Sequence, residues 1–139
     1  MHSYLKISTQ GQGLYEITED IERAISSHGY QSGLVNIFLQ HTSASLVIQE
    51  NADPSAKRDL ESWLGRFIRE DDSHFTHTAE GSDDMPAHIK AAITATSLCI
   101  PLVAGQLALG TWQGIYLWEH RRAAHLRKII VTVLDTNIG

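Results

Sequence analysis

The sequence has few of the features that mark disulfide-rich, membrane-spanning or disordered proteins. Its single cysteine, Cys99, has no partner for an intramolecular disulfide, and we expect a buried structural thiol. No uncharged apolar run approaches the length of a membrane span, and the first residues lack the apolar core of a signal peptide. We therefore expect a soluble cytoplasmic protein. Apolar residues make up 42% of the chain, which argues against disorder.

Basic residues are also scarce. The chain has 11 lysines and arginines against 16 aspartates and glutamates, which gives a net charge of −5. A surface that neutralises nucleic-acid phosphates needs clustered basic residues, so we expect no nucleic-acid partner. The one local basic cluster comprises Arg121, Arg122, Arg127 and Lys128. These residues could be solvated neighbours of a strand, or they could meet a small phosphorylated ligand.

The length of 139 residues fits one domain, residues 1–139, built around one core. Alternating or continuous apolar residues predict eight strands. They are Ser3–Ser8, Leu14–Thr18, Leu34–Gln40, Ser45–Gln49, Leu98–Val103, Leu107–Leu109, Ile115–Glu119 and Leu126–Leu134. The glycines between the first two strands predict a hairpin, and Ile129–Leu134 is apolar on both faces. The second feature indicates that a neighbouring subunit helps to bury this strand.

Three helices are predicted between the strands. Thr18 could cap the first helix, and Asp53 with Pro54 begins the longest one, whose apolar positions include Trp63 and Phe67. Pro86 begins the third helix. Because the strands do not simply alternate with helices, we predict an α+β domain rather than a doubly wound sheet.

Polar, reactive side chains follow several of these elements. His41, Thr42 and Ser43 come at a strand end, and Asn51 precedes the longest helix. Asp53 is either the cap of that helix or a functional acid, and the cap alone accounts for it. Gly110, Thr111, Trp112, Gln113 and Gly114 lie between two strands and form either a bulge with a core tryptophan or a bend that presents polar groups to a ligand. Glu119 at a strand end could be a base, a metal ligand or merely exposed.

Histidines and carboxylates gather around the long polar segment 69–85. His77 and Glu80 lie within it, and His88 follows in the first turn of the third helix, where the helix dipole favours a neutral ring. With His41, these residues could hold a divalent ion with an open position. The alternative is a set of surface histidines, which are frequent in this chain.

Five of these stretches together closely resemble the YjbQ family, also called UPF0047 or the secondary thiamine-phosphate synthase family. They are His41-Thr42-Ser43-Ala44, Glu50-Asn51-Ala52-Asp53-Pro54, His77 with Glu80-Gly81, Pro86-Ala87-His88-Ile89-Lys90, and Leu107 to Tyr116, ending at Glu119. The resemblance covers nearly the whole chain in order. Asp84, where relatives often have asparagine, and the segment 120–125 depart from the family pattern.

The resemblance implies a compact, β-rich α+β domain in which three helices pack on a mostly antiparallel sheet or sandwich, assembled as a homotrimer. It also implies a weak thiamine-phosphate synthase activity, which joins hydroxymethylpyrimidine diphosphate to thiazole phosphate and releases pyrophosphate. The catalytic candidates are then His41, Thr42, Ser43, Asn51, His88, Gln113 and Glu119. The substrate-binding candidates are Asp53, Gly110, Thr111 and Arg122, and the metal candidates are His41, His77, Glu80, Asp84 and His88.

Three functions remain open at this point. A transferase of this type would bind a phosphorylated ligand and use Mg²⁺ or basic side chains to neutralise the leaving group. A metal-dependent hydrolase would use the histidines to bind Zn²⁺ or another transition metal, which imidazoles favour. A trimer that only binds a small metabolite would need neither metal.

Overall fold

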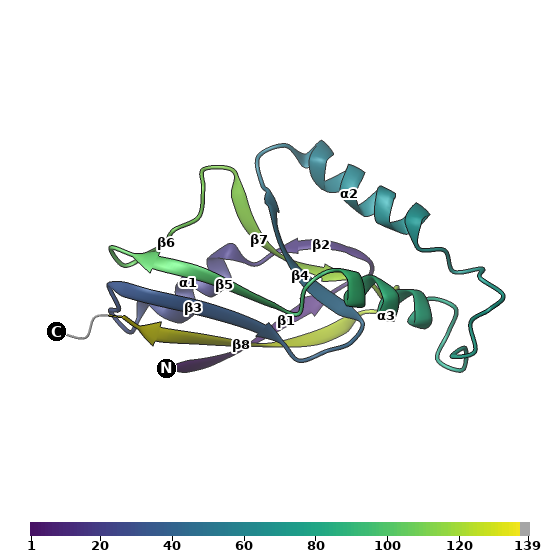
Figure 1. Ribbon diagram of the computed structural model, residues 1–139, viewed down its shortest axis with the longest axis horizontal. Helices are drawn as coiled ribbons and strands as arrows, with labels where there is room; N and C mark the ends of the chain where they lie inside the picture. Colours follow the sequence, from purple (N-terminus) through teal and green to yellow (C-terminus); the bar gives the residue numbers. More distant parts are fainter. Residues whose placement is uncertain (137–139) are drawn as a thin grey trace.

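Two antiparallel sheets and three helices make up the computed structural model, which describes residues 1–136 (Figure 1). The five-stranded sheet has the order β1 (His2–Thr9), β8 (His125–Asp135), β3 (Ser32–Leu39), β5 (Ser97–Val103) and β6 (Gln106–Leu107). The three-stranded sheet has the order β2 (Gly13–Glu16), β7 (Gln113–Glu119) and β4 (Ala44–Glu50). The helices are α1 (Thr18–Ser26), α2 (Pro54–Phe67) and α3 (Asp84–Ile93).

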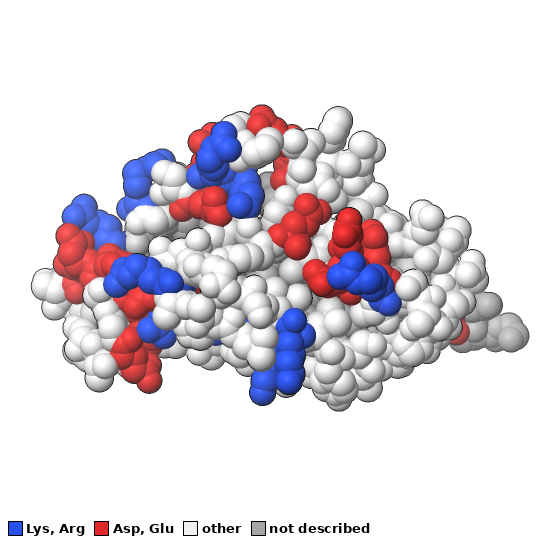
Figure 2. All heavy atoms as spheres, turned by 180° about the vertical axis from the view of Figure 1, so that it is seen from behind, with Lys and Arg blue, Asp and Glu red and all other residues white. Residues whose placement is uncertain are grey.

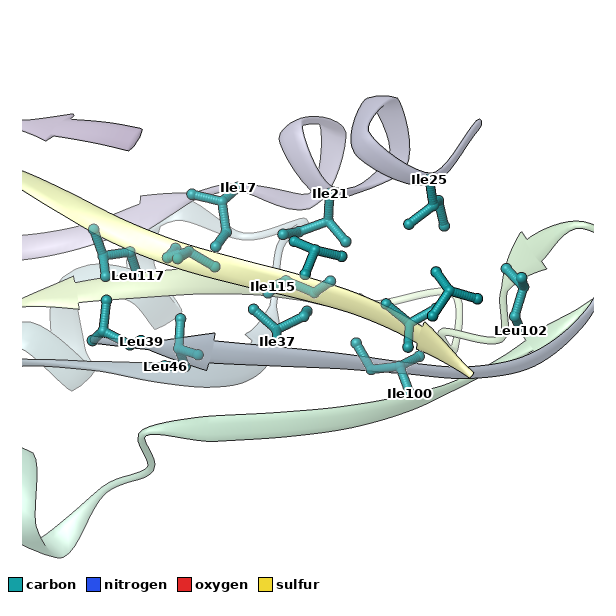
Figure 3. Close-up of a cluster of buried hydrophobic side chains, with 14 of the residues drawn as sticks. Ile17, Ile21, Ile25, Ile37, Leu39, Leu46, Ile100, Leu102, Ile115 and Leu117 are labelled. Carbon is teal, nitrogen blue, oxygen red and sulfur yellow. The ribbon is translucent and has the colours of Figure 1, made fainter. Parts of the chain in front are cut away.

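The main core lies between the inner faces of the two sheets, with α1 closing it. Strand β3 buries Val35, Ile37 and Leu39, because alternate side chains of a strand point to one face. Figure 3 shows Ile21 and Ile25 of α1 directed toward the isoleucines and leucines of the strands. Burial of each such side chain contributes about 1.5–3 kcal/mol.

Helix α2 covers the outer face of the three-stranded sheet. Leu64 is buried there against Leu14, Tyr116 and Trp118, which form a second, smaller core. Asp53 is the N-cap of α2. Its carboxylate accepts two hydrogen bonds from Ser55, one from the backbone N–H at 2.9 Å and one from the side-chain hydroxyl at 2.8 Å. The capping interpretation of Asp53 is therefore confirmed.

The outer face of the five-stranded sheet has no helix over it in the described part of the chain. We call this the open face and define it by the exposed side chains of Tyr4, Leu34, Phe38, Val103 and Leu134, from β1, β3, β5 and β8. A contiguous apolar surface of this kind is typical of an interaction site. Cys99 is exposed, which contradicts the expected buried thiol, because the alternation of β5 gives the buried positions to its neighbours Ile100 and Leu102.

The α+β class, the three helices and the antiparallel sheets are as the sequence predicts. The hairpin prediction is wrong, because β1 pairs with β8 and β2 pairs with β7, so the two strands belong to different sheets. Thr18 is also not the cap of α1. Ile17 holds that position, and the Thr18 hydroxyl instead donates to Glu16 Oε2 at 2.9 Å and accepts from the Ile115 N–H at 2.9 Å.

Two helix predictions need correction as well. Trp63 and Phe67 do not pack inward: they stack on each other with ring centroids 5.0 Å apart, and both are at least half exposed. Leu64 and its neighbours fill the covered part of the small sheet instead. Helix α3 begins at Asp84 rather than at Pro86, so His88 lies in its second turn. Trp112 is likewise exposed on the loop before β7 rather than in the core.

No helix among residues 1–136 is long and apolar enough to cross a membrane. Acidic and basic side chains are interspersed on the face shown in Figure 2, and neither sign covers it.

Candidate metal centre

Four residues from the α2–α3 loop and from α3 come together at one place: His77, Glu80, Asp84 and His88. Each offers one ligand atom, and these atoms all lie within 4.8 Å of one another. Asp84 and His88 are one helical turn apart, so their side chains share a face of α3. Gly81 turns the loop with a φ of 107°, a conformation that favours glycine.

The imidazoles of His77 and His88 converge on one carboxylate oxygen. His77 Nε2 lies 2.6 Å from Asp84 Oδ2, and His88 Nε2 lies 3.0 Å from the same atom. Glu80 Oε2 lies 3.3 Å from His77 Nε2. Asp84 is only 2% exposed, whereas His77 and Glu80 reach solvent, so the cluster has a buried base and an open side.

The hydrogen bond at Nδ1 of His88 determines whether its Nε2 carries a proton. Nδ1 lies 3.0 Å from the carbonyl oxygen of Thr42, which can only accept, so Nδ1 carries a proton and donates it. In the neutral ring, Nε2 then has a lone pair that faces the Asp84 carboxylate. Two lone pairs repel each other unless a cation lies between them. A metal-binding histidine usually donates its other ring N–H to a carboxylate or a backbone carbonyl, as His88 Nδ1 does to Thr42.

Asp84 is kept ionised by its neighbours. Burial acts to raise the pKa of Asp84, but the hydrogen bond from His77 and the nearby positive charges, including that of Arg121, outweigh burial and lower the pKa below its usual value. Arg121 Nη1 donates to Asp84 Oδ1 at 2.6 Å and Arg121 Nε donates to Asp83 Oδ2 at 3.0 Å. Arg121 therefore holds the oxygen that the histidines leave free and orients the carboxylate.

His41 lies next to this cluster but not in it. A hollow of about 240 Å³ is lined by His41, Thr42 and His88 together with three small residues of α3 and its C-terminal side, Ala91, Ala92 and Thr96. The Lys128 backbone N–H donates to His41 Nε2 at 2.8 Å, and Arg127 lies against Nδ1. Burial and the charge of Arg127 lower the pKa of His41, so its ring is neutral at pH 7. The structure thus places His41 beside the centre as part of its wall.

Glu119 lies in a second, fully buried cluster. Its carboxylate accepts from Thr9 Oγ1 at 2.7 Å, from Arg127 Nε at 2.7 Å and from the backbone N–H of Arg121 at 3.1 Å. Arg127 also donates to Ser43 Oγ at 3.0 Å. Burial acts to raise the pKa of Glu119, but the hydrogen bonds from Arg127 and Thr9 outweigh it and lower the pKa. Glu119 is therefore not exposed and has no free side for a ligand.

Four other candidates lie at the far end of the β4–β7 pair. Ala44 pairs with Glu119, and Glu50 pairs with Gln113, so the two ends are about 20 Å apart along the strands. Gln113 Oε1 accepts from the backbone N–H of Gly110 at 2.7 Å, and Asn51 Nδ2 donates to Glu16 at 3.4 Å. Within one chain, Asn51, Gly110, Thr111 and Gln113 are thus not brought to the candidate metal centre.

The basic cluster 121–128 does not consist of solvated residues alone. Arg122 is partly exposed, pairs with Glu70 and donates to Ser82 Oγ at 3.0 Å, so its guanidinium already has partners. Arg121 and Arg127 are largely buried and hold Asp84 and Glu119. Sequence reasoning missed Arg121 as a partner of the centre; the only signal was the pair of adjacent aspartates, Asp83 and Asp84, which must be compensated once buried.

Comparisons with known proteins agree with the resemblance stated above. A sequence model described as "UPF0047 protein YjbQ-like" matches residues 3–136. The chain is 49% identical over 129 residues to UPF0047 protein sll1880 of Synechocystis, covering 93% of this chain and 88% of that protein. It is 40% identical over 130 residues to UPF0047 protein YjbQ of Escherichia coli O157:H7, covering 93% of this chain and 94% of that protein.

Solved structures share the fold. The conserved hypothetical protein TT1486 of Thermus thermophilus superposes with a TM-score of 0.85 at 32% identity, covering 95% of this chain and 99% of that one. A YbjQ-like protein of unknown function from Sulfolobus solfataricus gives a TM-score of 0.85 at 25% identity, covering 97% and 98%. The names of these relatives give a family and a fold, and they state no reaction.

Proposed function

The chain belongs to the YjbQ-like UPF0047 family, and we propose that it is a metal-dependent enzyme whose centre is held by His77, Asp84 and His88. The observation that carries this proposal is the convergence of two Nε2 atoms on one buried carboxylate oxygen while His88 Nδ1 donates to a backbone carbonyl. Two imidazoles and a carboxylate are the ligands of catalytic zinc sites and suit other transition metals, whereas Mg²⁺ prefers oxygen ligands alone.

Hydrolysis is the reaction that this ligand set favours. A divalent ion bound here would supply Lewis acidity and a nucleophilic water at neutral pH. Arg121 fixes Asp84, and Thr42 fixes His88, so neither ligand needs to reorient during the reaction. Glu80 is the most exposed member of the cluster, which suits a general base beside an open position. The hollow next to His88 gives the substrate a place to lie.

The transferase reading rests on the family resemblance. The same centre could neutralise a diphosphate leaving group, since metal ions perform this role in phosphoryl chemistry. Arg122, the other residue proposed for the phosphate, is already paired with Glu70 and Ser82. We therefore place hydrolysis first and thiamine-phosphate synthase activity second.

Elemental analysis of the purified protein tests the centre. We expect about one zinc or other transition-metal ion per chain, lost in His77→Asn and Asp84→Asn variants. His74→Asn is the matched control, because His74 lies exposed in the same loop outside the cluster. Retention of the metal in both variants would show that these residues do not hold it.

The metal-loaded protein then separates the two reactions. Hydrolysis of p-nitrophenyl phosphate or p-nitrophenyl acetate, lost in Asp84→Asn, supports the hydrolase. Formation of thiamine phosphate from hydroxymethylpyrimidine diphosphate and thiazole phosphate, with release of pyrophosphate, supports the transferase instead. In the Glu80→Gln variant we expect the metal to remain and the rate to fall by about 100-fold or more, as for loss of a general base.

We also propose that the open face is buried against further copies of the chain. Its exposed leucines, Phe38 and Tyr4 form an apolar surface on a sheet, and the family resemblance implies a trimer. Sedimentation velocity should give a trimer for the wild type and a monomer for Phe38→Glu. The matched control is Trp63→Glu, which changes a similarly exposed aromatic residue on α2, away from the open face. A monomeric wild type at micromolar concentration contradicts the proposal.

A further inference from the structure

A second pocket, of about 360 Å³, shares no residue with the metal centre. It is lined by residues of α2, by one residue of α3, by the end of β7 with the residue after it, and by the start of β2 with the residue before it. These are Gln12, Gly13, Arg58, Glu61, Ser62, Leu64, Gly65, Lys90, Trp118, Glu119 and His120. Its volume lies in the range of about 300–1,000 Å³ typical of small-molecule sites.

Lys90 is the unusual residue of this pocket. Its side chain is only 6% exposed, and among residues 1–136 no hydrogen bond or ion pair reaches its amine. The same part of the chain contains no fully buried side-chain nitrogen or oxygen that lacks a hydrogen-bond partner. The Lys90 amine must therefore open into the pocket that it lines. A lysine that is buried without a partner is rare in proteins, because desolvation of the charge is costly.

The acidic residues near Lys90 already have partners. Glu119 is saturated by Arg127, Thr9 and backbone N–H groups. Glu61 accepts from the Leu14 N–H at 2.8 Å and lies 3.7 Å from Lys57 Nζ. The two more distant carboxylates that act on Lys90, Glu70 and Asp83, are paired with Arg122 and Arg121.

Arg58 adds a second free cation at the pocket. It is exposed, and it makes no hydrogen bond or ion pair with the described residues. The pocket therefore presents two unpaired positive charges, Lys90 and Arg58. Its two carboxylates, Glu61 and Glu119, already have other partners. A ligand with two negative charges on one group matches this arrangement.

The rest of the lining is apolar or offers single hydrogen bonds. Leu64 and Trp118 are buried side chains whose surfaces face the pocket. His120 is buried, and its Nε2 contacts Ser45 Oγ at 2.9 Å, while no hydrogen bond within residues 1–136 reaches its Nδ1. Gly13 has a positive φ and lies close to Glu61 of α2 on the pocket wall. A Cβ at this position would be only 2.7 Å from Glu61 Oε2.

We propose that this pocket binds a small phosphate monoester, with the phosphate at Lys90 and Arg58 and the apolar part of the ligand against Leu64 and Trp118. At neutral pH the phosphate is largely a dianion, which balances the two cations. The site is separate from the metal centre, so its occupancy does not depend on the proposed hydrolase.

Calorimetric titration of metal-free, chelator-treated protein tests the pocket. The probes are phenyl phosphate, inorganic phosphate and benzoate. We expect saturable binding of one phenyl phosphate per chain, weaker binding of inorganic phosphate, and much weaker binding of benzoate, which carries one charge. Lys90→Met should weaken phenyl phosphate binding about tenfold or more, since it removes a charge-assisted hydrogen bond.

Two further variants separate this site from the metal centre and from general damage. Asp84→Asn should bind phenyl phosphate as the wild type does. Arg58→Gln changes an exposed residue, leaves folding intact, and should weaken binding several-fold. If Lys90→Met unfolds, as judged by circular dichroism, Arg58→Gln decides. Absence of saturable binding, equal binding of benzoate, unchanged affinity in Arg58→Gln, or loss of affinity in Asp84→Asn would each overturn the proposal.

Discussion

The clusters around Asp84 and Glu119 contain the same kinds of residues but have opposite character. Both carboxylates are buried, and Arg121 contacts both: it gives its backbone N–H to Glu119 and its guanidinium to Asp84, while Glu119 also binds Arg127. Around Glu119 every acceptor position is filled by a donor. Around Asp84, two imidazole nitrogens compete for one oxygen, and one side is open to solvent.

From this difference we infer that Glu119 belongs to a structural ion pair and Asp84 to a binding site. A buried carboxylate whose lone pairs are all matched has no capacity for a ligand, however strongly its pKa is shifted. A carboxylate that faces the lone pair of a fixed imidazole gains from a cation between them. The chemistry of this chain is therefore expected at Asp84, although Glu119 is the more completely buried of the two.

Substitution of the two carboxylates should give the largest difference between the two clusters, measured as the loss of unfolding free energy. Glu119→Ala leaves the Arg127 guanidinium buried without its partner and should lower the free energy of unfolding by about 3–5 kcal/mol. Asp84→Asn in metal-free protein should cost clearly less, because Arg121 keeps Asp83 and the volume of the side chain is unchanged. Urea denaturation of both variants measures the two values. A larger loss in Asp84→Asn than in Glu119→Ala would reverse the assignment of roles.

Acidification should act most strongly through His120, which lies next to Glu119 in the chain and whose pKa is lowered to about 3. Burial, more than the nearby charge of Lys90, lowers the pKa of His120 from 6.5 to about 3. The unfolded chain takes up this proton below pH 6.5 and the folded chain does not, so unfolding is favoured progressively as the pH falls from 6.5 to 3. This contribution is at most about 5 kcal/mol.

Two measurements check the pH dependence. The imidazole resonances of His120 should stay those of a neutral ring at pH 5, as followed by NMR. In His120→Gln, the slope of unfolding free energy against pH between 6.5 and 5 should become shallower. A ring that titrates near pH 6.5 in the folded protein contradicts the prediction. Carboxylates with lowered pKa values, such as Glu119, lose their contribution only at lower pH, as the pH falls from about 4.5 through their folded values.

The sequence predicted those parts of the site that depend on local spacing. Asp53 caps α2 because a cap requires only the next few residues, and the spacing of His77, Glu80 and His88 along one loop and helix sufficed to group them. His41 was grouped with them on residue type alone. Its place depends on how β3 and β8 pair, and there the Lys128 N–H occupies its Nε2.

The parts that were missed depend on contacts between distant segments. The Glu119 cluster joins Thr9 of β1, Arg127 of β8 and Ser43 just before β4, and no local pattern marks such a set. The erroneous hairpin has the same cause: two adjacent strands with a glycine turn satisfy the local pattern, but β1 finds a better partner in the apolar strand β8. Lys90 belongs to a family motif but gave no sign of its burial, which depends on α2 and the end of β7, two elements distant in sequence that line the same pocket.

A substitution of Arg121 should act on the Asp84 cluster and spare the Glu119 cluster. Arg121 contacts both carboxylates, but it binds only Asp84 through its side chain. Arg121→Gln keeps the backbone N–H to Glu119 and removes the guanidinium that orients Asp84. We expect metal affinity to fall about 10–100-fold, as for other partners of metal ligands. Competition with a chelator of known affinity measures the change. Arg122→Gln is the matched control, because the Arg122 side chain binds Glu70 and Ser82 while its backbone N–H to Asp83 is retained. Equal losses in the two variants would mean that general surface charge, rather than the orientation of Asp84, tunes the centre.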